Sequence, residues 1–400
     1  MLANSPPIPL VIDHRDRNIA AEDEGGIFFA LKQPNRIRRI RVMLSSQKFQ
    51  KFVMAIDEEF PILEYLVLES RGDGTMTFPE TIRAPHLRHL VLDGVASPIA
   101  SRLLISAMGL VTLHLVMYYS SSNINPNSLL QLISPLSQLE TLEVTASVLQ
   151  VNRDAEMHTP TITHTTLPNL RWLSLQGVIA YLEVLVHRIA APRLERLHIA
   201  FYEHLTNSIP CIVWIMNTEN KKLRSDSAKF EFADSHVRVE SLPYDALYFH
   251  PDQWCYPCSF GISNSWMRIN GHISSMSQIV DALGQVLSVV EHLILDREVY
   301  YLSPGQGFEV EVDRTELHKL LRPFVNVKSL RVNHRLVKEF SRSLQLDDGE
   351  LPLEILPELQ ELTYSAGSFD VTFASFIDAR QNAGHPVSLV RRSPSSSTSE

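Results

Sequence analysis

A short pattern of aliphatic residues recurs along the chain and constrains its fold more than any other feature. Each copy has an aliphatic residue, two variable residues, a second aliphatic, one variable residue and a third aliphatic, as in Leu63-Glu-Tyr-Leu66-Val-Leu68. Between residues 37 and 194, successive copies begin 23 to 31 residues apart. Recurrence of one phrase at such a period is typical of repeat proteins. The copies begin at Ile37, Leu63, Leu87, Leu110, Leu139, Leu170, Leu194, Val290, Val327 and Leu359.

The spacing inside each copy predicts a short strand. The last two aliphatics are two residues apart, so a strand places both on one face, toward a core. Between copies the apolar spacing becomes helical, as in Phe49, Phe52, Val53 and Ile56. One strand and one helix per period is the organisation of a leucine-rich repeat, whose units bury their apolar faces against their neighbours. We therefore expect an α/β leucine-rich-repeat (RNI-like) solenoid, with a curved, mostly parallel sheet and helices on the convex face.

The departures from this pattern suggest where the segments of the chain begin and end. Residues 1–33 read as an extended lead-in that ends in a short helix from Ile27 to Leu31. The solenoid is expected over residues 34–386, and within it Ser275 and Gln278 form a capping-box pattern for a helix. Residues 201–274 lose the period, and are either irregular repeats, the interpretation we favour, or an insertion. The serine-rich end predicts a disordered tail over residues 387–400.

Charge and composition restrict the classes of partner. The formal net charge is -9, without a long block of one sign, so we expect no general attraction to nucleic acid or to an anionic membrane surface. No stretch approaches the roughly 18 consecutive apolar residues of a membrane helix, and the first residues lack the pattern of a secretory signal. Together with only three cysteines, these features favour a reducing compartment, the cytoplasm or the nucleus.

Residues that could support catalysis or hold a metal do not form a recognisable constellation. Cys255 and Cys258, with His250 nearby, come closest, but a structural zinc site needs four ligands and nothing in the sequence places Cys211 beside them. Nucleotide-binding, serine-hydrolase and zinc-protease motifs do not occur in the sequence. We expect no cofactor, no metal site and no catalytic residue, and hence a binding protein. A metal-dependent or redox enzyme built on Cys255 and Cys258 is an alternative.

The variable residues of the strands would project together from the exposed face of the sheet. Aromatic and arginine side chains are enriched among the residues that dominate protein interfaces. Tyr65, Trp172 and Arg196 are therefore expected anchors, although Trp172 could instead pack against a residue of an adjacent strand. Histidines that lie between core aliphatics point the same way. The candidate partner-binding residues are Tyr65, His89, His114, Trp172, Arg196 and His198.

Five phrases of the chain carry a resemblance to a known family. They are Pro9-Leu-Val-Ile-Asp13, Phe52-Val-Met-Ala-Ile-Asp-Glu-Glu-Phe60-Pro61, Ala84-Pro-His-Leu-Arg-His-Leu90, Leu167-Pro-Asn-Leu-Arg-Trp-Leu173 and Ala379-Arg-Gln-Asn-Ala-Gly-His-Pro386. In combination they resemble the F-box/leucine-rich-repeat-like proteins of mushroom-forming fungi, over nearly all of residues 9–390. Members of that family usually begin with an F-box, which docks to the ligase. That module is missing from this sequence, and Leu351-Pro-Leu-Glu-Ile-Leu356 only superficially resembles its opening.

The resemblance implies a protein-protein interaction module, the substrate-recognition domain of an F-box receptor for a cullin-type ubiquitin ligase. Such receptors position a protein substrate and leave the chemistry to other subunits. The expected partner is therefore a protein substrate, with a ligase adaptor only if an F-box lies upstream. We expect no nucleic acid and no membrane as partners. A stand-alone leucine-rich-repeat scaffold without a ligase link is the alternative.

Overall fold

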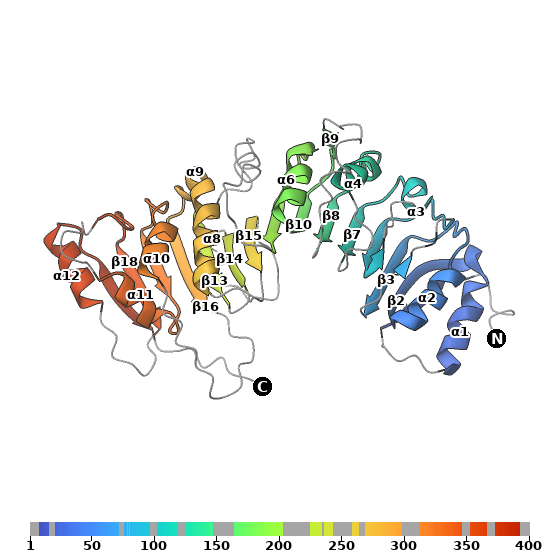
Figure 1. Cartoon of the computed structure of the whole chain (residues 1–400), viewed down its shortest axis with the longest axis horizontal. Coiled ribbons are helices and arrows are strands. Elements are labelled where there is room, and N and C mark those ends of the chain that lie inside the picture. Colours follow the sequence, from blue (N-terminus) through green and yellow to red (C-terminus); the bar gives the residue numbers. More distant parts are fainter. Residues whose placement is uncertain are drawn as a thin grey trace. The chain divides into compact units, whose positions relative to one another are not determined.

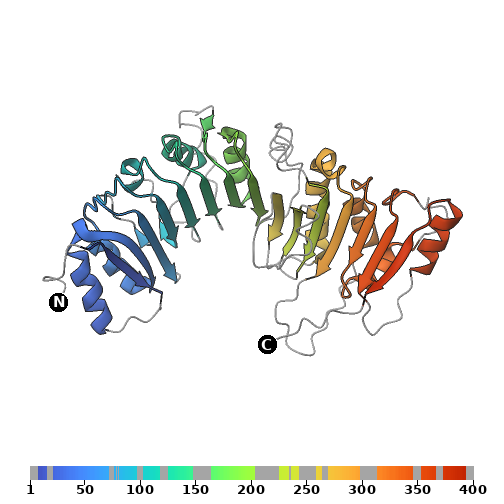
Figure 2. The same ribbon diagram turned by 180° about the vertical axis from the view of Figure 1, so that it is seen from behind.

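The chain divides into two compact units, Met1–Glu195 and Arg196–Glu400. Each is a mixed α/β unit in which helices lie along one face of a large, mostly parallel sheet, as Figures 1 and 2 show for either unit. This computed structural model describes residues 8–15, 21–71, 76–77, 79, 81–96, 102–117, 125–146, 164–202, 225–233, 236–242, 258–263, 269–297, 313–345, 353–365 and 373–392.

The strands of the first unit pair in the order in which they occur in the chain, and every adjacent pair of the large sheet is parallel. Parallel neighbours need a crossover between them, which returns the chain to the same edge of the sheet. The order is β1 (Leu10–His14), β2 (Ile37–Ser45), β3 (Tyr65–Arg71), β5 (His89–Asp93), β7 (Thr112–Met117), β8 (Thr141–Ala146) and β10 (Trp172–Gly177). Two small pairs flank it: β4 (Met76–Thr77) with β6 (Val95–Ala96), and β9 (Thr165–Thr166) with β11 (Ile189–Ala190).

Helices occupy several of the crossovers of the first unit. Helix α2 packs against β2 and β3, and α6 packs against β10 and α4. The apolar stripe at 49–56 therefore marks a helix, as its spacing predicts, with Ile56 as the C-cap. The helices are α1 (Ala21–Leu31), α2 (Ser46–Ala55), α3 (Arg102–Ser106), α4 (Pro126–Ile133) and α6 (Ile179–Arg188), with the 3-10 helix η2 (Pro34–Arg36).

The repeated aliphatics form the core of the first unit. Five of them are register neighbours on successive strands, and each is fully buried: Ile40, Leu66, Leu90, Leu113 and Leu142. Burying one such side chain contributes about 1.5–3 kcal/mol relative to leaving it exposed. The strand prediction and its inward face are confirmed for this row.

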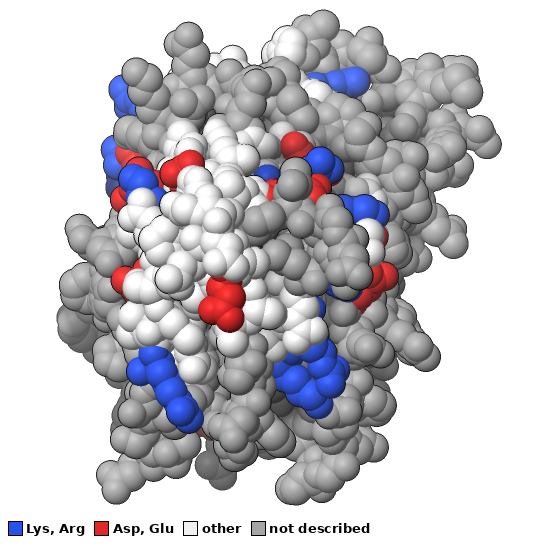
Figure 3. Space-filling model, turned by 90° about the vertical axis from the view of Figure 1, so that its left-hand side faces the viewer, with Lys and Arg blue, Asp and Glu red and all other residues white. Residues whose placement is uncertain are grey.

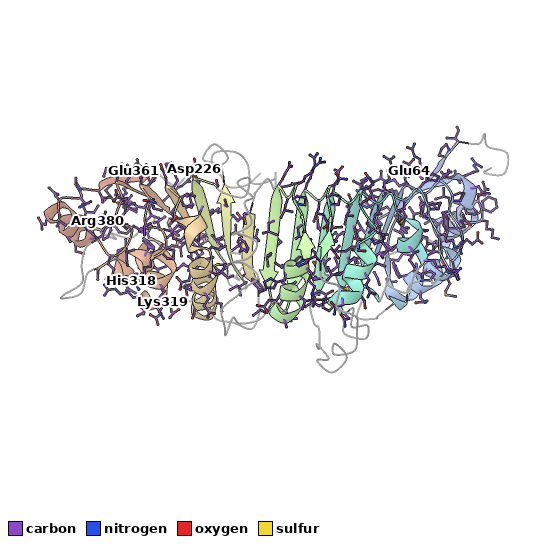
Figure 4. The ribbon with its side chains drawn as sticks, turned by 90° about the horizontal axis from the view of Figure 1, so that it is seen from above. Glu64, Asp226, His318, Lys319, Glu361 and Arg380 are labelled. Carbon is purple, nitrogen blue, oxygen red and sulfur yellow. The ribbon has the colours of Figure 1, made fainter. Side chains whose placement is uncertain are left out.

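A backbone hydrogen-bond pattern recurs where successive strands begin. The carbonyl oxygen of Glu64 accepts two bonds from the next repeat, from the backbone nitrogens of Arg88 at 2.9 Å and His89 at 3.0 Å. Because one carbonyl binds two amides, each repeat fixes the start of its neighbour's strand. Figure 4 labels Glu64 and, in the second unit, Asp226 and Glu361 at such strand starts. Six further carbonyls accept two amides in this way: Arg88, Val111, Glu140, Asp226, Glu291 and Lys328.

The sheet of the second unit interrupts the parallel order once. Strand β14 is antiparallel to both neighbours, β13 and β15, whereas the other described strand pairs of the second unit's sheet are parallel. The short connection between β13 and β14 allows only an antiparallel pair, because a parallel pair needs a long crossover. The order is β12 (Arg196–Phe201), β15 (Cys258–Ser263), β14 (His236–Leu242), β13 (Ser227–Phe232), β16 (His292–Arg297), β17 (Ser329–Val332), β18 (Glu361–Ser365) and β19 (Ser388–Arg392).

This arrangement bears on the two interpretations of residues 201–274. The described strands of that segment belong to the same sheet as β12 and β16, whether the segment consists of irregular repeats or of an insertion. Their antiparallel course is not that of strand–helix repeats, so the favoured interpretation does not describe it fully. The alternating runs at 229–232 and 236–240 are strands, as their period of two predicts.

The helix cap predicted in the second unit needs a correction. Helix α8 begins at Ile269, so Ser275 lies in its interior, where it is buried, and does not cap it. The capping prediction is wrong because the helix extends further toward its N-terminus than the local motif indicates. The helices are α8 (Ile269–Ala282), α9 (Gly284–Leu287), α10 (Arg314–Leu321), α11 (Val337–Ser343) and α12 (Ala374–Asn382).

The predicted lead-in contains more regular structure than its sequence indicates. Strand β1 pairs with β2, and α1 continues through Gly25 and Gly26, although glycine disfavours a helix interior by about 1 kcal/mol. Contacts with α2 offset this cost. Lys51 Nζ donates to Glu24 Oε1 at 2.6 Å and lies 4.8 Å from the centre of the Phe28 ring.

The predicted disordered tail also begins with regular structure. Residues 388–392 form β19, which pairs with β18, and the Ser388 amide donates to the Gln360 carbonyl oxygen at 2.8 Å. The prediction failed there because a strand can be held by its backbone partner without an apolar pattern of its own. Residues 393–400 lie outside the described part. Figure 3 views the α12 end of this unit, where most of the described surface is uncharged and the charged residues are scattered. In β19, the apolar side chains of Leu389 and Val390 are exposed.

Candidate functional site

The exposed face of the first unit's sheet brings the predicted side chains into rows. Because the strands are parallel and in register, Tyr65 of β3 lies beside His89 of β5, and the same row continues through Thr112 and Thr141 to Trp172 of β10. On its other side, Tyr65 is the neighbour of Arg39 in β2. All six side chains are partly exposed. We call Arg39, Tyr65, His89, Thr112, Thr141 and Trp172 the aromatic row.

Direct contacts join the first four members of the aromatic row. The Arg39 guanidinium carbon lies 4.1 Å from the centre of the Tyr65 ring, in a cation–π arrangement. The rings of Tyr65 and His89 are 5.8 Å apart and tilted by 46°. His89 Nδ1 is 3.1 Å from Thr112 Oγ1, at hydrogen-bond distance. These contacts hold side chains from four strands in fixed positions, as a preformed recognition surface requires.

A second row lies beside the first on the same face. It contains Arg41, Val67, Val91, His114 and Glu143 in register. His114 Nδ1 lies 3.6 Å from Glu143 Oε2 at one end of the row. Arg41, at the other end, forms no salt bridge within the described part of the chain. Val67 is only 3% exposed, although it points to this face, because longer neighbours cover it. The middle of this row is therefore apolar and its two ends are polar.

Trp172 lies at the far end of the aromatic row, next to Thr141. It is partly exposed, which is compatible with a role as an anchor. The structure also places it beside an adjacent strand, as the alternative interpretation supposes. Its role in binding stays a prediction.

The last two predicted residues, Arg196 and His198, belong to β12 in the second unit. Both are partly exposed. His198 faces Ser259 in the register of β15, and burial together with the nearby Arg238 charge lowers the pKa of His198 to about 4. The ring is therefore neutral near pH 7. It is less accessible than an exposed contact residue, and its neighbours are the charged side chains described next.

A network of charged side chains covers the face of the second unit's sheet on β13, β14 and β16. Lys229 Nζ lies 3.3 Å from Glu231 Oε2 and 3.1 Å from Asp296 Oδ2. Arg238 Nη1 lies 3.1 Å from Glu240 Oε1, and its Nη2 is 3.8 Å from Glu231 Oε1. His236 Nε2 is 3.3 Å from the same oxygen of Glu231. We call these six residues the charged network.

The residues of the charged network are not among the binding residues predicted from the sequence. Its signal was present, because the alternating runs at 229–232 and 236–240 place every charged residue on one face and every apolar residue on the other. What the sequence could not show was the antiparallel pairing, which sets Glu231 opposite Arg238 and Lys229 opposite Glu240. Opposite charges on facing positions stabilise such a pair and its register.

One carboxylate of the charged network is poorly solvated. Glu240 is 1% exposed, and its Oε2 is buried without a hydrogen-bond partner among the described residues. Burial is the main cause that raises the pKa of Glu240, against the opposing effect of Arg238. A group of this kind costs stability when it is charged.

The cysteine alternative rests largely on residues that lie outside the described part of the chain, namely Cys211, His250 and Cys255. Cys258 is described: it lies in β15 with its thiol facing the core, and burial raises its pKa. A buried thiol with a raised pKa is a weak nucleophile. Within the described ranges, no group of three or more histidine, cysteine or acidic residues is arranged to hold a metal ion.

Comparisons with known proteins assign no family to the chain. No protein-family model matches it, and a search of curated proteins finds no significant match. Among the described residues, no helix has the length and apolar character needed to cross a membrane.

Proposed function

We propose that the strand–helix units are leucine-rich repeats, with the helices on the convex side of each unit, and that the chain is a protein-recognition module. Three features support the repeats: the buried aliphatic rows, the parallel register, and the carbonyls that each bind two amides of the next repeat. The further support for leucine-rich repeats is the resemblance described above.

The observation that carries the binding function is the aromatic row. Arg39, Tyr65, His89 and Thr112 come from four strands, are partly exposed, and are held by direct contacts. Arginine and tyrosine are common among residues that dominate interfaces, because they combine apolar area with polar groups. The bound molecule is proposed to be a protein substrate, and the chain to be the recognition domain of a ubiquitin-ligase receptor, as the resemblance implies.

The test compares partner capture by variants on the two faces. Tyr65→Ala removes the centre of the aromatic row, and Met54→Ala removes a residue of α2 that is 65% exposed and serves as the matched control. Proteins that co-purify with the wild type from the native source should be lost with Tyr65→Ala and retained with Met54→Ala. Loss with Met54→Ala alone would place the binding surface on the helices and contradict the proposal.

A second measurement separates the ligase role from that of a stand-alone scaffold. The cellular half-life of a captured partner is measured with and without this protein. A recognition domain for ubiquitin-dependent turnover predicts a longer half-life when the protein is removed. An unchanged half-life would favour the scaffold.

A further inference from the structure

Two arginines on β2 form no salt bridge among the described residues, although their charges help Arg15, the main cause, to lower the pKa of Asp13. Arg39 and Arg41 both point to the exposed face of the sheet, and among the described residues neither forms a salt bridge. The nearby acidic residues bind elsewhere: Asp13 pairs with Arg15 at 3.0 Å, and Glu64 with Arg38 at 2.9 Å. Asp13 is the register neighbour of Arg41 and still turns to Arg15.

The Arg39 guanidinium is held in place and retains hydrogen-bonding capacity. Its central carbon lies 4.1 Å from the centre of the Tyr65 ring, and its Nε is buried without a hydrogen-bond partner in the described part of the chain. A guanidinium that stacks on a ring keeps its N–H groups at its edge, where they can bind two oxygens of a carboxylate or a phosphate. Holding it in advance reduces the conformational entropy lost on binding.

The spacing of the two arginines suits one oxyanion between them. They are separated by one residue on a strand, so their Cα atoms are roughly 7 Å apart and their long side chains can converge. The apolar side chains of Tyr65 and Val67 adjoin them in register and lower the local solvation. Arg15 lies near the carboxylates of Asp13 and Glu69. Together with Arg39 and Arg41 it gives this corner of the face three positive charges and two negative ones.

We propose that Arg39 and Arg41 form an oxyanion-binding subsite for a carboxylate or phosphate group on an extended segment of the partner. Tyr65, which is partly exposed, contacts the apolar part of the residue that carries the oxyanion. This inference rests on the proposed function, because it assumes that the sheet face binds a protein. It adds the chemistry of the bound segment, which no other feature of the chain specifies.

The experiment measures binding of the whole protein to a library of peptides with one fixed central residue. The fixed residue is glutamate, phosphoserine, glutamine or serine, and the flanking positions are random. The wild type is compared with the double variant Arg39→Gln/Arg41→Gln. The matched control is Arg38→Gln/Arg83→Gln, which changes the net charge equally and removes two exposed arginines outside the subsite. Unchanged thermal midpoints establish that each variant is folded.

The subsite predicts that the wild type enriches glutamate or phosphoserine peptides over their neutral counterparts, and which of the two dominates identifies the source of the oxyanion. The double variant should lose at least tenfold of that enrichment, and the control should keep it. Enrichment of peptides regardless of the fixed residue would overturn the subsite and leave the binding face intact. A wild type that enriches no peptide would overturn the subsite, while the capture experiment with Tyr65→Ala would still decide the proposed function.

Discussion

The Arg380 side chain donates a hydrogen bond of 2.7 Å from Nη2 to the carbonyl oxygen of Pro357. Arg380 belongs to α12 and is fully buried, at the end of the second unit where Figure 4 labels it. The same guanidinium also reaches the carbonyls of Ile355 and Leu359 at 3.4 Å, so it fixes the turn that leads into β18. Leu356, in this turn, has a φ of 50°, an uncommon conformation that such bonds help to maintain.

The first prediction concerns this interaction. Arg380→Met keeps much of the side-chain volume and removes the donors, so the part-buried carbonyls of Ile355 and Pro357 and the buried carbonyl of Leu359 lose their partner. We expect the free energy of unfolding to fall by about 2–4 kcal/mol. Urea denaturation measures it. The control is Arg322→Met, whose side chain is 74% exposed and should change stability by less than about 0.5 kcal/mol. Equal effects of the two substitutions would contradict the role given to Arg380.

The second prediction separates the core from the binding face. Leu90 and Leu173 are 0% and 3% exposed, so Leu90→Ala or Leu173→Ala should each cost about 2–5 kcal/mol through lost burial and a cavity. Tyr65→Ala should leave the fold intact apart from about 1 kcal/mol for the lost cation–π contact. Chemical denaturation of the three variants checks this, with Ile105→Ala, 66% exposed, as an outer control. If Tyr65→Ala unfolds the protein as readily as Leu90→Ala, the assignment of faces is wrong.

The third prediction concerns pH and His198. The pKa of His198 is lowered from 6.5 to about 4 by burial, so the folded protein binds a proton there less readily than the unfolded chain. The contribution of the neutral His198 to the free energy of unfolding is therefore fully present above pH 6.5 and is lost as the pH falls from 6.5 toward 4. His198→Asn cannot titrate and should reduce this acid-side loss. Unfolding free energies of both proteins at several pH values test it, and parallel pH profiles would contradict it.

The fourth prediction concerns Glu240, for which the free energy of unfolding changes with pH in the opposite direction. Burial raises its pKa above 4.5, so the unfolded chain releases this proton more readily. The folded protein then loses stability as the pH rises from 4.5 through the raised pKa. Glu240→Gln should therefore gain stability relative to the wild type as the pH rises over that range. A difference in unfolding free energy that does not vary with pH would show that Arg238 compensates the charge fully.

The sequence alone determined the strands of the repeated phrases and the direction in which their side chains face. The spacing of Leu66 and Leu68, or of Leu90 and Leu92, depends only on the period of a strand, and burial followed it in each case. It likewise identified Tyr65, His89 and His114 as side chains of the exposed face, because they alternate with those aliphatics. These properties are local, and a single segment carries the information for them.

The tertiary structure alone decided which strand lies beside which, and therefore which side chains meet. Four features depend on a partner that is distant in the sequence. They are the contact of Arg39 with Tyr65, the charged network around Glu231, the helix through Gly25 and Gly26, and the pairing of β19. Such contacts stabilise the protein only after the intervening chain has folded and brought the two partners together. A local pattern therefore predicts an element and its face, whereas register and neighbours follow from the packing of the whole unit.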